Sequence, residues 1–139
     1  MARKPKAFVL DSWAVLAYLG DEAASQEAAE LIATAHENRT PMFMSSVNAG
    51  EVWYIVAREI SEADADRAIS DVLSLGIEFV DVDWSLTRTA ASFKAKHRMS
   101  YADCFAAALA KEHRCELVTG DNEFKQVEGE VGVRWLSRI

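Results

Sequence analysis

One helix in the second half of the chain restricts what the whole chain can fold into. Helical spacing predicts a helix from Tyr101 to about His113, and Ser100 is placed to cap its start. Up to Ala110 this helix is apolar almost all round, and Asp103 is its one charged residue there. A helix without a broad polar face is expected to be buried on more than one side.

A second isolated carboxylate follows this helix. The apolar pair Leu117–Val118 predicts a short buried strand, and the segment from Thr119 to Asp121 predicts a turn out of it. Asp103 thus lies at a helix start and Asp121 just past a strand end. Local structure alone also accounts for both, because Ser-x-x-Asp is a common capping pattern and Gly-Asp-Asn is ordinary turn chemistry.

The rest of the chain alternates short apolar runs with helical periodicity. This order favours a mainly parallel sheet of four to five strands with helices on both faces, an α/β fold. The predicted strands cover residues 7–10, 42–44, 77–82, 117–118 and 131–136. The predicted helices cover residues 13–19, 22–37, 47–56, 62–75, 84–96 and 101–113, with a short turn or helix at 123–125.

Length and composition predict one soluble domain spanning residues 1–139. No stretch approaches the roughly 20 apolar residues of a membrane span, and the apolar run after the basic lead is too short for a signal peptide. Cys104 and Cys115 lack disulfide-framework spacing, which favours reduced thiols and a cytoplasmic location. The three histidines have no metal-binding spacing, so zinc chemistry is not expected. The net charge of −7 argues against broad attraction to nucleic acid, although acids neutralised by a metal would not repel it.

Four acids from distant segments are expected to meet at one edge of this sheet. Asp11 and Asp121 follow predicted strands, whereas Glu51 and Asp103 are expected in the first turns of helices. Functional residues of such sheets gather at the carboxyl ends of the strands. Local alternatives remain open, since Asp11 also suits a helix cap and Glu51 shares a polar helix edge with Arg58.

Clustered carboxylates favour a divalent cation. Without one, four acids at one site would raise one another's pKa values, and a cation removes that penalty. Ligand sets made only of oxygen select Mg²⁺ or Mn²⁺ over zinc or copper.

The sequence resembles the PIN-domain nucleases, and among them the VapC-type toxins of bacterial toxin–antitoxin pairs. Four motifs in order carry the resemblance: Phe-Val-Leu-Asp11-Ser-Trp-Ala-Val-Leu-Ala-Tyr-Leu, Asn48-Ala-Gly-Glu51, Ser100-Tyr-Ala-Asp103-Cys-Phe-Ala-Ala-Ala-Leu-Ala and Leu-Val-Thr119-Gly-Asp121-Asn-Glu-Phe. The resemblance implies a PIN-like fold and a Mg²⁺-dependent endoribonuclease, with Mn²⁺ as a substitute. It also implies a homodimer, an RNA substrate and inhibition by a small antitoxin.

Under this resemblance the four acids become the catalytic set. Asp11 and Asp103 are the expected direct metal ligands, and Asp121 completes the shell directly or through water. Glu51 is expected to bind a second ion or to orient the attacking water.

Other residues are expected to support this set or to contact the substrate. Thr119 would hold Asp121 or a ligand water through its hydroxyl, and Asn48 and Ser12 are further supporting candidates. The cations just before the Asp103 helix are candidates for RNA binding or for a solvated helix end: Lys94, Lys96 and Arg98.

Two other functions fit parts of the sequence. A receiver-like signalling domain also has alternating strands and helices and an acidic Mg²⁺ pocket, and Asp81 ends a predicted strand. Against it, the first strand ends in one acid rather than two, and no lysine lies in a late strand-end turn. A PIN-like scaffold that binds RNA or protein without cleaving is the other alternative, which the intact acidic set disfavours.

Overall fold

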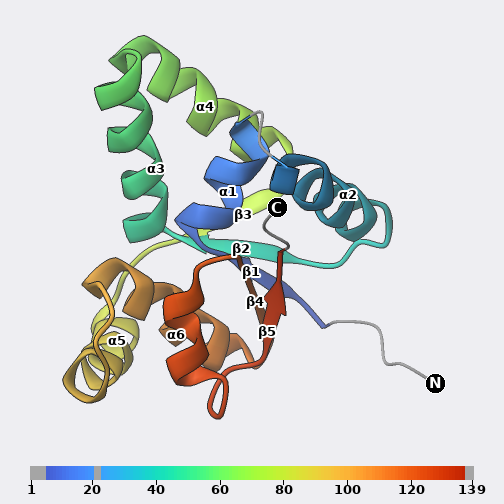
Figure 1. Cartoon of the computed structure of the whole chain (residues 1–139). Coiled ribbons are helices and arrows are strands. Elements are labelled where there is room, and N and C mark those ends of the chain that lie inside the picture. Colours follow the sequence, from blue (N-terminus) through green and yellow to red (C-terminus); the bar gives the residue numbers. More distant parts are fainter. Residues whose placement is uncertain (1–5, 21–22, 137–139) are drawn as a thin grey trace.

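A single parallel sheet forms the centre of the molecule (Figure 1). The computed structural model describes residues 6–20 and 23–136. The five strands pair in the order β3-β2-β1-β4-β5, and each described pair is parallel. Their bounds are β1 Phe8–Leu10, β2 Met42–Ser45, β3 Ile77–Val80, β4 Glu116–Thr119 and β5 Val133–Trp135. The predicted α/β fold with a mainly parallel sheet is confirmed, with five strands.

Helices cover both faces of the sheet. The helices are α1 Ser12–Leu19, α2 Ala23–Glu37, α3 Ser46–Glu59, α4 Glu62–Ser74, α5 Trp84–Lys96 and α6 Tyr101–His113, and a 3₁₀ helix, η1, covers Asn122–Val127. In Figure 1, α1 to α4 lie above the sheet, and α5 and α6 lie below it. Alternate strand residues face opposite layers. Phe8 and Leu10 pack on the upper layer, whereas Val9 packs on the lower one.

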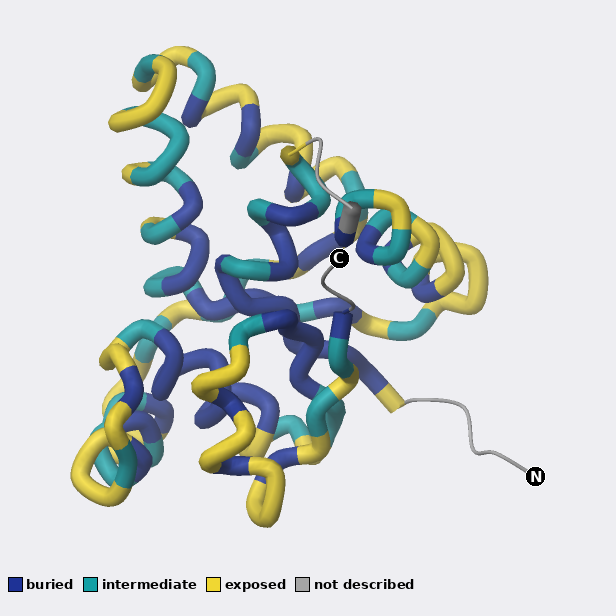
Figure 2. The backbone as a smooth tube through the Cα atoms, viewed as in Figure 1, coloured by how far each residue is buried: buried dark blue, intermediate teal, exposed yellow. Residues whose placement is uncertain are grey.

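The apolar helix α6 is as buried as its composition predicts. Every residue from Cys104 to Ala110 is buried, and the dark blue stretch below the sheet in Figure 2 includes them. Ala106, Ala107 and Ala110 are small residues of this stretch, and none exceeds 1% exposure. Small side chains let α6 pack against the sheet on one side and α5 on the other, because they add little width between the elements.

Capping residues account for where most helices begin. Side chains of Asp11, Ser45, Ser61, Asp83 and Ser100 each accept a hydrogen bond from a backbone N–H in the first turn of the next helix. Two predicted helices, Trp84–Lys96 and Tyr101–His113, therefore have the bounds read from the sequence.

Several other bounds differ from those predicted. Strand β3 stops at Val80 rather than Val82, and β5 covers 133–135 rather than 131–136. Helix α3 begins at Ser46, so Glu51 lies in its second turn and not its first. Helix α2 begins at Ala23, and Glu22, the expected first residue, lies outside the described residues.

Among the described helices, none is both long and apolar enough to cross a membrane.

Candidate metal centre

Asp11 is the most buried acid of the site and serves two neighbours at once. It lies between β1 and α1 with 1% of its surface exposed. One carboxylate oxygen, Oδ1, accepts the Ala14 backbone N–H at 2.8 Å and caps α1. The other, Oδ2, accepts the Thr119 hydroxyl at 2.5 Å. Asp11 is therefore a helix cap, one of the two readings left open by the sequence, and its second oxygen is held by Thr119.

Thr119 joins the ends of two adjacent strands. Its hydroxyl donates to Asp11 and accepts the backbone N–H of Asp121 at 3.0 Å. The Asp121 carboxylate in turn accepts the backbone N–H of Glu123 at 3.0 Å. The expected contact between Thr119 and Asp121 is thus made through the backbone of Asp121, which fixes the turn that carries the carboxylate.

Glu51 reaches the same edge of the sheet from α3. Its Oε1 accepts the Ser12 hydroxyl at 2.6 Å and the Asn48 side-chain amide at 3.5 Å. The same amide nitrogen of Asn48 donates to the Ala102 carbonyl at 3.0 Å. Asn48 is fully buried and also contacts Ser45. One side chain therefore fixes α3 to the first turn of α6, just beside Asp103.

Asp103 lies at the start of α6 and comes close to two acids of the following turn. It is 8% exposed, and its backbone N–H is capped by Ser100. Carboxylate oxygens of Asp103, Asp121 and Glu123 all lie within 4.8 Å of one another. We call this group, together with Asp11 and Glu51, the acidic cluster.

Burial and mutual repulsion raise two pKa values in the acidic cluster. Burial raises the pKa of Asp11 to about 8, with smaller contributions from the charges of Asp103 and Asp121, while hydrogen bonds from Thr119 and Ala14 act against it. Burial also raises the pKa of Asp103 to about 7, followed by the charges of Asp121 and Glu51. Both shifts mean that the folded chain resists the fully ionised cluster.

A divalent cation fits this donor set. The three closest oxygens belong to carboxylates, the ligands that Mg²⁺ and Mn²⁺ prefer. A cation would also offset the repulsion that raises the pKa values of Asp11 and Asp103.

The sequence model of the PIN domain matches residues 8–130. The chain belongs to the PIN-domain family. A comparison with curated protein sequences finds no significant match. The family assignment excludes the receiver-like alternative, and Asp81, on which that alternative depended, is exposed in the loop after the edge strand β3.

Several solved structures similar to this PIN domain are VapBC or VapC proteins of toxin–antitoxin systems. VapBC2 from Rickettsia felis, solved with a DNA fragment from its promoter, has a TM-score of 0.79 at 15% identity, covering 94% of this chain and 99% of that chain. VapC20 from Mycobacterium tuberculosis, described as a sarcin-ricin loop cleaving toxin, has a TM-score of 0.70 at 23% identity, with coverages of 92% and 99%. FitAcB from Neisseria gonorrhoeae has a TM-score of 0.67 at 19% identity, with coverages of 91% and 95%. At these identities the similarity shows a shared fold.

Glu123 is a member of the acidic cluster that the sequence analysis missed. Residues 123–125 were predicted only as a turn or short helix. Glu123 lies in η1 and is exposed. The signal was the spacing Asp121-x-Glu123 in a tight turn after a buried strand. Because Asp121 caps η1 through the Glu123 N–H, the two carboxylates are held on the same side of that turn.

Gly120 permits the close approach of α1 to the turn that carries Asp121. A Cβ atom at Gly120 would lie 2.2 Å from Cη2 of Trp13, far inside contact distance. The glycine between Thr119 and Asp121 is therefore required by the packing of the Trp13 ring.

The predicted RNA-binding cations have different environments. Lys94 donates to the Met99 carbonyl at 2.6 Å and so stabilises the connection between α5 and α6. Arg98 is fixed through its backbone, which bonds Gln126 through both its N–H and its carbonyl. Lys96 is exposed near the end of α5. Within the described residues, none of the three forms an ion pair with the acidic cluster.

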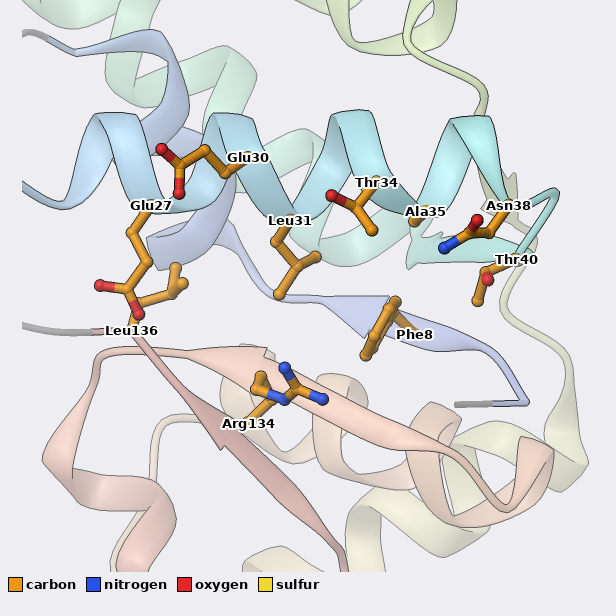
Figure 3. Close-up of a pocket in the computed structure, with 10 residues that line it drawn as sticks. All are labelled: Phe8, Glu27, Glu30, Leu31, Thr34, Ala35, Asn38, Thr40, Arg134 and Leu136. Carbon is orange, nitrogen blue, oxygen red and sulfur yellow. The ribbon is translucent and has the colours of Figure 1, made fainter. Parts of the chain in front are cut away.

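A hollow between α2 and β5 lies apart from the acidic cluster (Figure 3). Its volume is about 360 Å³, and its lining includes the apolar side chains of Leu31 and Phe8. From β5, the Arg134 guanidinium lies 5.6 Å from the centre of the Phe8 ring. No acid of the cluster lines this hollow, so it is a separate feature.

Proposed function

We propose that this PIN domain, with residues 1–139 forming one domain, is a Mg²⁺-dependent endoribonuclease, with Mn²⁺ able to substitute. The observation that supports the proposal most strongly is the convergence of carboxylates from four separate segments of the chain at one edge of the sheet. The raised pKa values of Asp11 and Asp103 indicate a site that is more stable with a cation than without one.

Asp11, Asp103 and Asp121 are the proposed metal ligands, and Glu123 joins them on the exposed side. When bound, the cation lowers the pKa of a coordinated water and stabilises negative charge on the phosphate. Thr119 favours the ionised form of Asp11 by donating a hydrogen bond to it. Its second hydrogen bond holds the turn of Asp121 beside Asp11.

Glu51 is held by Ser12 and Asn48 rather than by the closest group of oxygens. Two roles fit this placement: orienting the water that attacks phosphorus, or binding a second ion. In either role, the hydrogen bonds from Ser12 and Asn48 leave one carboxylate oxygen, Oε2, without a described hydrogen bond. That oxygen is free to contact the water or the ion.

The proposed biological role is that of the toxin in a toxin–antitoxin pair. The VapBC and VapC structures named above support a toxin role and a cognate antitoxin. A homodimer and a cytoplasmic location are further parts of the proposal. An antitoxin would inhibit most simply by inserting an arginine or lysine among the acids, because its charge can replace that of the cation.

Cleavage by the purified protein tests the proposal. With Mg²⁺ or Mn²⁺ it should cut unpaired regions of a structured RNA, and EDTA should stop it, since an unpaired strand adapts to a recessed site more easily than a duplex. Asp103→Asn should lower the rate by orders of magnitude. Expression of the wild type without an antitoxin should halt growth, and Asp103→Ala should restore it. If both proteins are harmless and neither cuts cellular RNA with Mn²⁺ present, the chain is a binding scaffold.

A further inference from the structure

A basic hollow lies between α5 and the last turns of α6. Its volume is about 220 Å³, and Arg88, Lys96 and Lys111 line it together with the hydroxyl residues Thr89 and Ser92. The three cations are exposed, so they are available to a ligand. The Lys111 ammonium lies 5.5 Å from the centre of the Phe93 ring, which positions the charge at the wall of the hollow.

A second hollow adjoins the first and lies beside the starts of β1 and β4. It has a volume of about 400 Å³, shares Lys111 and Glu130 with the first, and adds Lys6 and Arg114. We call the two together the basic groove, with the cations Lys6, Arg88, Lys96, Lys111 and Arg114.

Three acids also line the basic groove, namely Glu112, Glu116 and Glu130, so its five cations outnumber its acids. Glu112 accepts a hydrogen bond from Ser85 at 3.0 Å, and Glu116 pairs with Arg134, which lies outside the groove. Across residues 6–20 and 23–136, no cation of the basic groove forms an ion pair. Clustered cations that the chain leaves unpaired favour an anionic ligand.

The charge distribution makes this groove distinctive in an acidic protein. From Trp84 to Ala102 the chain carries Arg88, Lys94, Lys96 and Arg98 and no acid. By contrast, residues 23–82 carry eleven acids and three arginines. A polyanion would therefore meet far less repulsion along α5 than over the helices on the other face of the sheet.

The basic groove leads away from the acidic cluster. Ser85 near the start of α5 contacts Glu112 near the end of α6, and Lys94 near the end of α5 contacts Met99 just before α6, so the two helices are antiparallel. Lys96 is thus at the end of α5 close to the start of α6, where Asp103 lies. Lys111 follows Asp103 by eight residues, which is about 12 Å along a helix.

We propose that the basic groove binds the phosphate backbone of the RNA beyond the cleaved position. This inference rests on the proposed nuclease function and adds to it the path of the substrate over α5 and α6. Cations and hydroxyls suit phosphate oxygens without selecting bases, so the groove contributes affinity and leaves sequence choice to the acidic site. An acidic protein segment would fit the charge alone, but it would not need a groove that leads from a phosphodiester-cleaving site.

Two triple variants of equal charge change test the groove. Arg88→Gln/Lys96→Gln/Lys111→Gln removes groove cations, and Arg39→Gln/Arg58→Gln/Arg67→Gln removes three cations from the opposite half of the chain. Both are placed on Asp103→Asn to prevent cleavage, and binding of fluorescein-labelled polyuridylate is measured by anisotropy over a range of salt. The groove variant should bind at least about tenfold more weakly at low salt. Its salt slope should fall by about two, because each lost contact with a single strand removes about 0.7.

The control variant should keep the slope of the Asp103→Asn protein. Equal slopes for the groove variant and its parent, or equal losses in both triple variants, would overturn the proposal. So would competition by polyglutamate at the affinity of polyuridylate.

Cleavage distinguishes the groove from the proposed function. With Asp103 intact, the groove variant should raise KM for a long RNA by a larger factor than KM for a short oligonucleotide, because only the long RNA extends along the whole groove. If the unmodified protein cuts neither substrate, the nuclease function fails, while the salt slopes still report whether the groove binds RNA.

Discussion

At the scale of single residues, the site depends on carboxylates whose environment opposes their charge. Asp11 shows this most clearly, because burial outweighs two favourable hydrogen bonds and raises its pKa to about 8. The folded state therefore binds a proton that the unfolded state, with an ordinary pKa of 3.8, has already released.

Stability of the metal-free protein should consequently fall as pH rises. Between pH 3.8 and about 8 the folded state holds more protons at Asp11, so stability is highest at the acidic end of this window and lowest above pH 8. The slope reaches at most about 1.4 kcal/mol per pH unit for one group. Urea unfolding in EDTA measures it, and Asp11→Asn should flatten the decline. Asp64→Asn is the control, because Asp64 is remote and its pKa is lowered rather than raised. A decline that persists unchanged in Asp11→Asn would contradict this assignment.

Asn48 should prove as important as the acids it positions. Asn48→Ala removes the donor to the part-buried Ala102 carbonyl and the acceptor of the Ser45 hydroxyl proton, although Ser45 still accepts the backbone N–H of residue 48; an unsatisfied buried group typically costs about 1–3 kcal/mol. The substitution also frees α6 beside Asp103, so Mn²⁺ affinity should fall by about 10–100-fold, the usual effect of losing a supporting contact. Asn38→Ala, at the exposed end of α2, is the control for calorimetric titration. Unchanged Mn²⁺ affinity in Asn48→Ala would show that Asp103 does not depend on this contact.

At the scale of elements, the position of the Asp121 turn depends on how α1 packs against it, through the contact between Trp13 and Gly120. Gly120→Ala would place a methyl group 2.2 Å from the Trp13 ring, so either the ring or the turn of Asp121 must move. Overpacking of this kind typically costs about 1–3 kcal/mol. Thermal unfolding should show the loss in Gly120→Ala and not in Gly129→Ala, where a Cβ atom has no neighbour within 4 Å. Equal melting temperatures for the two variants would mean that the turn adapts freely.

The whole molecule shows which features a sequence can predict and which require the fold. Helices α5 and α6 were predicted with correct bounds because their periodicity can be read from the sequence. Ser100 also marks the start of α6 as its capping residue. The parallel sheet followed from the alternation of elements. The strand order did not, and neither did the contact between Asn48 and Ala102, which are 54 residues apart.

Two side chains illustrate the limit at the site itself. Strand ends and helix starts indicated the four predicted acids, but Glu123 lies in a turn whose orientation depends on Asp121. Charge made Lys94 a candidate for RNA binding or for a solvated helix end, whereas its ammonium group contacts a backbone carbonyl that only the folded connection brings near. Charge and spacing indicate which residues can take part; tertiary contacts decide how each is used.

Calorimetric titration with Mn²⁺ tests most directly whether the acidic cluster is a metal centre. The wild type should bind the ion and gain thermal stability by mass action on the folded state. Asp11→Asn and Asp103→Asn should each weaken binding by more than about tenfold while remaining folded, and Asp64→Asn should bind as the wild type does. If Asp11→Asn and Asp103→Asn bind Mn²⁺ as tightly as the wild type, the acidic cluster is not the metal site and the proposed mechanism is wrong.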